Sequence, residues 1–261
     1  MVDMKDLLQR LDAWMEAYMT SFYTEDPAIQ QAILIKQKHT GCVKKISREL
    51  AGHLGLSAHD VTLAEIMGLL HDVGRFRQFT LYQTFNDALS EDHAALGLKV
   101  LQELPLLQEL SRQDRERLCF AIQNHNKKTI APAKDARDML FARLLRDADK
   151  LDIYRVLEPY IAPSDGSGFS PHFLEQFLEA RQCDYTQIRT QDDRKLVRLM
   201  WIYDVNFSWT LQRIVARGYV DKIIACLPED ESLAAGVKRL RAYVADKCAT
   251  ADRINFAGIR S

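Results

Sequence analysis

The chain is poor in cysteine and has no arrangement of it that suggests a redox or structural role. Its 261 residues include only five cysteines, an odd number, and no two of them form a Cys-x-x-Cys pair. We therefore expect reduced thiols rather than a disulfide framework. The cysteines are Cys42, Cys119, Cys183, Cys226 and Cys248.

Long apolar runs and an excess of positive charge are also missing. No uninterrupted apolar run approaches the roughly 20 residues that a membrane-spanning helix needs. The N-terminal segment Met1-Val2-Asp3-Met4-Lys5-Asp6 has acids where a signal peptide has a basic region and an apolar core. With a net charge of -1, the chain has no electrostatic footprint for a nucleic acid polymer or a membrane. These features predict a cytoplasmic globular protein and leave its oligomeric state open.

Strand-like alternation of period two is absent as well, and apolar residues recur instead at helical spacings. The first such segment carries Leu7, Leu8, Leu11, Trp14, Met15 and Tyr18. We predict an all-α protein in two parts. A core of helices spans residues 1–160, and a C-terminal helical extension over 170–261 packs on that core. A surface loop rich in proline, serine and glycine, over 159–171, lies between them.

Start and stop signals place the other expected helices. Asp26-Pro27 and Ser57 with Asp60 have the form of helix N-termini. The expected helices cover about 27–52, 57–72, 90–104, 113–124, 134–157, 173–181, 192–217, 220–226 and 229–248. Residues 74–90 contain Phe76, Phe79, Tyr82 and Phe85 without a helical repeat, which predicts an ordered loop with short turns.

The pair His71-Asp72 follows an apolar helix and is the strongest indication of a functional site. A buried carboxylate is costly without a partner, and a divalent cation satisfies an imidazole and a carboxylate together. Any one of the other candidates could be an ordinary core or surface residue. As an ordered series on separate helical segments, they suit a bundle whose inward side chains meet at one point. The other candidate ligands are His39, His93, His125 and Asp149. Nitrogen and oxygen donors without cysteine indicate hydrolytic or oxygen-activating chemistry rather than a structural zinc site.

With these residues in place, the sequence resembles the HD superfamily of metal-dependent phosphohydrolases over about residues 30–157. The resemblance is carried by His39, Leu70-His71-Asp72-Val73-Gly74-Arg75, His93 with Gly97, His125, and Asp147-Ala148-Asp149-Lys150-Leu151-Asp152. It implies that His39, His71, Asp72 and Asp149 bind one divalent ion. His93 and His125 would bind a second, with Asp72 bridging the two.

The choice of Asp149 over Asp147 follows from the same resemblance, because Asp149 directly precedes the Lys-Leu that matches the family's terminal motif. Asp147 then orients a ligand or a water, or is a plain salt-bridge partner. The sequence does not identify the ions, and iron, manganese, zinc, cobalt, nickel or magnesium would suit these donors.

The resemblance also implies an activity. The expected function is phosphomonoesterase or phosphodiesterase action on a nucleotide or other small phosphate ester, through a metal-activated water. Asp72, Arg75 and Asp149 are the predicted catalytic residues. Arg75 could hold phosphate oxygens bidentately or could be an ordinary solvated arginine, and the two interpretations are about equal. Further candidates for substrate binding are Arg77, Lys127 and Lys150.

Two alternatives belong to other classes of protein. Some proteins with the same ligand series use an iron pair to activate oxygen, so a non-haem di-iron oxygenase is one of them. The other is a non-catalytic, metal-stabilised sensor or interaction module. The residues after His125 lack the double histidine and Gly-Tyr-Pro string of the cyclic-dinucleotide phosphodiesterases. That substrate is therefore not expected.

Overall fold

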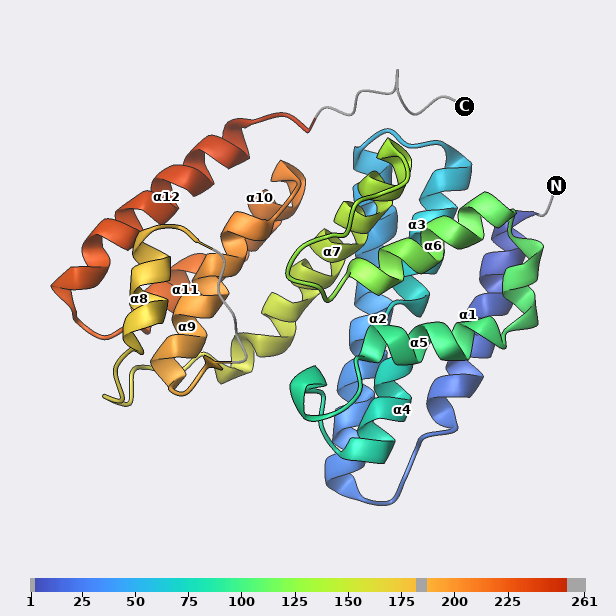
Figure 1. Ribbon diagram of the computed structural model, residues 1–261, viewed down its shortest axis with the longest axis horizontal. Coiled ribbons are helices and arrows are strands. Elements are labelled where there is room, and N and C mark those ends of the chain that lie inside the picture. The colour runs from blue at the N-terminus through green and yellow to red at the C-terminus, as the bar shows by residue number, and fades with distance from the viewer. Residues whose placement is uncertain (1–2, 182–186, 253–261) are drawn as a thin grey trace. The chain divides into compact units, whose positions relative to one another are not determined.

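The structure is a computed structural model that describes residues 3–181 and 187–252. Helices account for all the regular secondary structure in these two ranges, which contain no strand (Figure 1). The predicted all-α fold is therefore confirmed. Contacts between Cα atoms divide the chain into two compact units, the first ending at Asp152 and the second beginning at Ile153. The expected boundaries at 1–160 and 170–261, and the packing of the extension on the core, stay predictions.

The first unit consists of the helices from α1 through most of α7. Their bounds are α1 Met4–Thr20, α2 Pro27–His53, α3 Ala58–Leu70, α4 Val73–Tyr82, the 3-10 helix η1 Asp87–Leu89, α5 His93–Gln102, η2 Pro105–Glu109, α6 Arg112–Asn124 and α7 Ala136–Leu157. The predicted helix N-caps are present: the Asp26 carboxylate accepts hydrogen bonds from the N–H groups of Ala28 and Ile29. Ser57 accepts from the N–H of Asp60 in the same way.

Two close helix contacts shape the first unit, and each depends on a glycine. Helix α2 packs on α3, and α4 packs on α5. A Cβ added at Gly68 would lie 2.6 Å from Ser47 Oγ and 2.9 Å from the carbonyl oxygen of Val43. A Cβ added at Gly74 would lie 2.5 Å from the amide nitrogen of Gly97 and would overlap the carbonyl oxygen of His93. These glycines let the segments that carry the candidate ligands approach one another closely.

The prediction of a loop over 74–90 is wrong for its first half. Helix α4 occupies Val73–Tyr82, and only residues 83–92 form a connecting segment, with the short η1 within it. Val73 and Phe76 are one turn apart and both buried, and Phe76 packs on the aromatic ring of Phe22. Burial of this face stabilises a short helix despite Gly74 near its start. The helix ends at Gln83, which has a φ of 52°.

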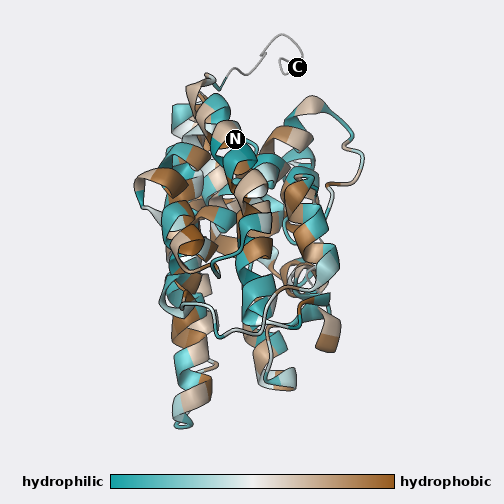
Figure 2. Cartoon of the chain, turned by 90° about the vertical axis from the view of Figure 1, so that its left-hand side faces the viewer, coloured by the Kyte–Doolittle hydropathy of each residue, from teal (hydrophilic) through white to brown (hydrophobic). Residues whose placement is uncertain are grey.

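The second unit contains α8 Pro171–Leu178, α9 Gln191–Met200, η5 Trp201–Asp204, α10 Ser208–Ala216, α11 Tyr219–Ala225, η6 Glu231–Leu233 and α12 Ala234–Ala249. Its helices are amphipathic, and brown and teal residues alternate along the ribbons in Figure 2. The single helix expected over 192–217 is instead broken between η5 and α10. The Asp252 carboxylate accepts hydrogen bonds from the N–H groups of Ser208 and Trp209, at 2.8 and 2.9 Å. A helix N-terminus is thereby stabilised where the sequence pattern predicts continuity.

Two further expectations can be compared with the described residues. The four cysteines in these ranges form no disulfide, and Cys183 lies outside the described residues. Of the helices the structure describes, none combines the length and apolar character needed to span a bilayer. The cytoplasmic location remains a prediction.

Candidate metal centre

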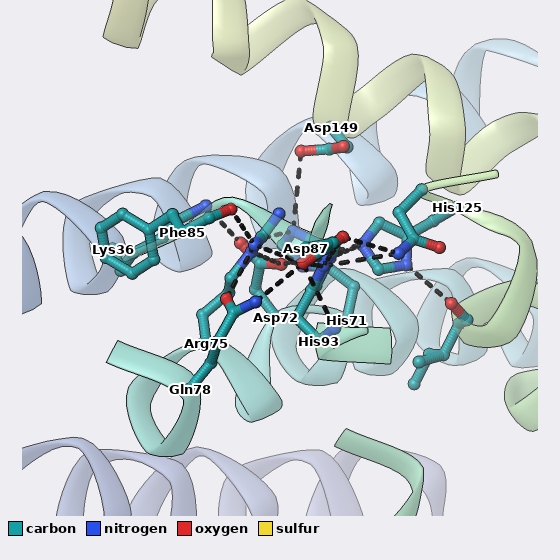
Figure 3. Close-up of polar contacts among 12 residues, drawn as sticks. Lys36, His71, Asp72, Arg75, Gln78, Phe85, Asp87, His93, His125 and Asp149 are labelled. Carbon is teal, nitrogen blue, oxygen red and sulfur yellow. Dashed lines mark hydrogen bonds and ion pairs between the residues drawn. The ribbon is translucent and has the colours of Figure 1, made fainter. Parts of the chain in front are cut away.

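The predicted ligands converge on one place in the first unit, where Figure 3 labels all of them except His39. The imidazoles and the Asp72 carboxylate are buried, with at most 6% of any of these residues exposed. They come from different elements, which the bundle brings together. His39 lies within α2, His71 and Asp72 join α3 to α4, His93 begins α5, His125 follows the end of α6, and Asp149 lies on α7.

Asp72 lies between two pairs of histidines, with one oxygen toward each pair. Its Oδ2 is 3.5 Å from His39 Nε2 and 3.6 Å from His71 Nε2. Its Oδ1 is 3.3 Å from His93 Nε2 and 3.7 Å from His125 Nε2. We call His39, His71 and Asp72 the first half-site, and Asp72, His93 and His125 the second half-site. The ligand atoms of each half-site all lie within 4.8 Å of one another.

Hydrogen bonds behind the rings fix which nitrogen faces the centre. Nδ1 of His71 is 2.9 Å from the carbonyl oxygen of Gly68, and Nδ1 of His125 is 2.6 Å from that of Ile122. A carbonyl oxygen can only accept, so these Nδ1 atoms carry the proton and Nε2 presents a lone pair. Such a partner at the second nitrogen is what orients histidine ligands in metal sites.

The other two rings are oriented by carboxylates. Nδ1 of His39 lies 2.7 Å from Asp152 Oδ2, and Nδ1 of His93 lies 2.7 Å from Asp87 Oδ2. Each half-site therefore combines one histidine supported by a carboxylate with one supported by a carbonyl. In both cases Nδ1 donates, and Nε2 is left facing Asp72.

This arrangement fits a divalent cation in each half-site. The two Nε2 atoms are 3.3 Å apart between His39 and His71, and 2.9 Å apart between His93 and His125. Two lone pairs at such distances repel unless a cation or a proton lies between them. Burial lowers the pKa of His71 and lowers that of His93 to about 4, so both rings are neutral and can act as ligands. Neutral imidazole and carboxylate are suitable donors for iron, manganese, cobalt, nickel or zinc.

Asp149 approaches the first half-site from α7, on the side opposite Arg75 and Gln78 in Figure 3. Its Oδ1 is 3.0 Å from His39 Nε2 and 3.7 Å from His71 Nε2, and 21% of its side chain is exposed. Burial opposes protonation of His39, but the carboxylates of Asp149 and Asp152 outweigh it and raise the His39 pKa. This position therefore favours positive charge. Asp147, the alternative ligand, is fully buried on the same helix.

Of the predicted substrate-binding residues, Arg75 lies nearest the centre. Its Nη1 donates to Gln78 Oε1, the carbonyl oxygen of Phe85 and Asp87 Oδ1, at 2.6 to 3.0 Å. Its Nε forms an ion pair with Asp72 Oδ1 at 3.6 Å, beyond hydrogen-bond distance, and has no hydrogen-bond partner among the described residues. One nitrogen thus fixes the guanidinium, while the buried Nε–H beside Asp72 donates no hydrogen bond.

The other three candidates have more peripheral positions. Lys127 forms an ion pair with Asp92, and 42% of its side chain is exposed. Arg77 is exposed on α4. Burial raises the pKa of the Tyr18 phenol to about 12, and the positive charge of Arg77 only partly opposes this shift. Lys150 follows Asp149 on α7 and is partly exposed. Substrate binding by these residues stays a prediction.

Sequence reasoning missed the residues that surround the ligands. Lys36 donates from Nζ to Asp72 Oδ2 at 2.7 Å, and its side chain is only 11% exposed. The available signal was its position three residues before His39, on the same face of α2. Asp152 has the same relation to Asp149 on α7. Asp87 gave no such signal, because it meets His93 and Arg75 through the path of the chain after α4. Gln78 lies three residues after Arg75, but the sequence did not predict the helix α4 that carries both.

Comparison with known families agrees with this geometry. Residues 37–154 match the family model of the HD domain. For the part of the chain that it covers, somewhat less than half, this match to the HD domain implies a metal-dependent, hydrolase-like superfamily. Searches of curated proteins and of solved structures give no match.

Proposed function

We propose that this protein is a phosphohydrolase that uses two divalent cations and acts on a nucleotide or another small phosphate ester. The observation that carries the proposal is the position of the Asp72 carboxylate, whose two oxygens face different histidine pairs. Such a carboxylate can bridge two ions. We expect no nucleic acid polymer and no membrane as a partner.

The residues around Asp72 favour an anionic substrate. When bound, two divalent cations would supply Lewis acidity and activate a water for in-line attack on phosphorus. Arg75 lies next to Asp72 with an Nε–H that donates no hydrogen bond, while its Nη1 is held by three acceptors. This guanidinium is therefore preorganised to donate to a phosphoryl oxygen and to offset developing negative charge.

Lys36 supplies a second positive charge on the other side of the carboxylate. It contacts Asp72 Oδ2, whereas Arg75 lies near Oδ1. The charge of Lys36 also holds the pKa of Asp72 well below its usual value, against the effect of burial. Asp72 is thus kept ionised, as a ligand must be. The positively charged side chains of Lys36 and Arg75, so close to the centre, suit a phosphate ester better than an apolar substrate for oxygenation.

The test is a phosphate-release screen with nucleotides and small phosphate esters, on protein loaded with manganese, iron, cobalt or zinc. We expect hydrolysis of at least one ester, abolished by chelation and by Asp72→Ala. Oxygen uptake by iron-loaded protein, with no phosphate release from any ester, would favour the di-iron oxygenase. Cation binding with neither activity would favour the non-catalytic module.

A further inference from the structure

The two half-sites have the same inner ligands but differ in the support behind them. Asp152, behind His39, lies within helix α7, and 1% of its side chain is exposed. Asp87, behind His93, lies in the one-turn helix η1, and 31% of its side chain is exposed. No residue of η1 is buried, and Leu89 in it is 73% exposed. The second half-site therefore depends on a surface segment, residues 83–92.

Asp87 joins this segment to three other parts of the centre. Its Oδ1 accepts from Arg75 Nη1 at 3.0 Å and from Gln78 Nε2 at 2.8 Å. Its Oδ2 lies 2.7 Å from His93 Nδ1 and accepts from Asn126 Nδ2 at 3.1 Å. These donors come from α4, from α5 and from the turn after α6. One carboxylate thus connects three elements around the second half-site.

Gln78 on helix α4 holds segment 83–92 in place through hydrogen bonds. It is fully buried on α4, and its amide nitrogen also donates to Ser90 Oγ and to the carbonyl oxygen of Glu91. Segment 83–92 is therefore attached at both ends of η1, so the position of Asp87 is determined by packing. An exposed acid that merely balanced surface charge would have no such buried support.

The contact with His93 acts on the orientation of a ligand. Nδ1 and Nε2 are bonded to the same carbon of the rigid planar ring, so fixing the direction of Nδ1 also fixes that of Nε2, which faces Asp72. We propose that Asp87 is a positioning residue that sets the affinity of the second half-site for its cation, separately from the first. This inference rests on the proposed two-cation centre. Asp87 itself would not touch the cation.

The test is a titration of the chelator-treated full chain with Mn²⁺, followed by calorimetry and by electron paramagnetic resonance. We expect the wild type to bind two ions. In Asp87→Asn one of the two dissociation constants rises about 10- to 100-fold, as removal of a supporting residue usually causes. The other constant stays unchanged. The spin coupling between paired Mn²⁺ ions disappears at concentrations that fill only the stronger site.

Two variants serve as controls. Glu91→Gln removes one negative charge from the same exposed segment without touching His93, and both affinities should stay at the wild-type values. Asp87→Glu retains a carboxylate and should bind both ions with affinities closer to the wild type than those of Asp87→Asn. Far-UV circular dichroism should be the same for all variants, because Asp87 lies outside the helical core.

Several outcomes would overturn the inference. Unchanged affinities in Asp87→Asn would refute the role of Asp87 while leaving a two-cation centre intact. Equal weakening of both sites, or loss of helical signal, would show a general structural role instead. The same weakening of cation binding in Glu91→Gln would show that the effect comes from surface charge and not from the contact with His93. A wild type that binds no Mn²⁺, and no other divalent ion, would refute the proposed function itself.

Discussion

Two polar clusters among the described residues of the first unit, an arginine network and the candidate metal centre, differ in how far their own atoms satisfy one another. The arginine network consists of Arg117 with Asp114, Asp135 and Asp138. Arg117 is 5% exposed, and its nitrogens lie 3.0 Å from Asp138 Oδ1, 3.2 Å from Asp114 Oδ1 and 3.5 Å from Asp135 Oδ2. The other cluster is the metal centre, in which Asp72 is surrounded by four imidazoles.

The two clusters differ in where their hydrogens lie. In the arginine network each close contact joins a carboxylate to a guanidinium N–H, so the polar atoms satisfy one another. In the metal centre the imidazole protons point outward to Gly68, Ile122, Asp87 and Asp152, and lone pairs face inward. Burial of polar groups therefore does not identify a functional site by itself. The orientation of donors and acceptors distinguishes a structural ion-pair network from a cation site.

The largest effect on stability is expected in the arginine network. Arg117→Met removes the guanidinium and leaves the largely buried carboxylates of Asp114 and Asp138 without their cation, which should cost about 3–5 kcal/mol of unfolding free energy. Denaturant unfolding should give the same loss with and without a chelator, because this network requires no metal. A loss that vanished when metal was removed would contradict the distinction between the two clusters.

The corresponding change in the metal centre should act on function. His71→Ala removes a ligand of the first half-site and should lower phosphate-ester hydrolysis at least about 100-fold, more than loss of a supporting residue. Unfolding free energy measured in chelator should change much less than in Arg117→Met. His53→Ala, an exposed histidine at the end of α2, is the matched control and should retain full activity. Similar losses in both variants would contradict a role for His71 in metal binding.

A glycine pair separates the geometry of the centre from general helix stability. Gly74→Ala forces α4 away from His93 and should cost about 1–3 kcal/mol and weaken cation binding. Gly41→Ala, on the exposed face of α2 with nothing within 4 Å of an added Cβ, should stabilise by about 0.5–1 kcal/mol. Thermal unfolding and a Mn²⁺ titration of both variants provide the measurements. Unaltered cation affinity in Gly74→Ala would show that close packing of α4 on α5 is not required.

The smallest effect is expected at the edge of the centre. Lys127 is tied to Asp92 and partly exposed, so Lys127→Gln should change KM only a few-fold and leave kcat unchanged. Steady-state kinetics with whichever ester the screen identifies would measure this. A large fall in kcat would place Lys127 among the catalytic residues and enlarge the site beyond the buried cluster.

The sequence predicted the candidate ligands better than the residues around them. His71 and Asp72 are adjacent, and the other ligands lie on separate periodic segments, so a helical bundle with inward side chains was enough to bring them together. Lys36 required knowledge of which face of α2 meets Asp72. Asp87 required the path of the segment after α4, which depends on the packing of Phe76 and Gln78. Long-range contacts decide these positions, and local periodicity does not contain them.

Fold prediction failed for the same reason at two places. Helix α4 is short and contains Gly74, and its aromatic residues show little helical periodicity. Its stability depends instead on the packing of Phe76 on Tyr18 of α1. The break before α10 depends on Asp252, which lies 44 residues after Ser208. Hydrogen bonds across such separations cannot be read from a local pattern. The helices expected over 27–52, 57–72, 90–104, 113–124 and 134–157 have bounds close to those of α2, α3, α5, α6 and α7.

Anomalous diffraction from crystals of the full chain soaked in Mn²⁺ tests the central claim most directly. We predict two peaks on either side of Asp72. One should lie among His39, His71 and Asp149, and the other between His93 and His125. Crystals with no peak at this carboxylate, or with manganese bound only elsewhere, would contradict the assignment of these side chains as a cation site.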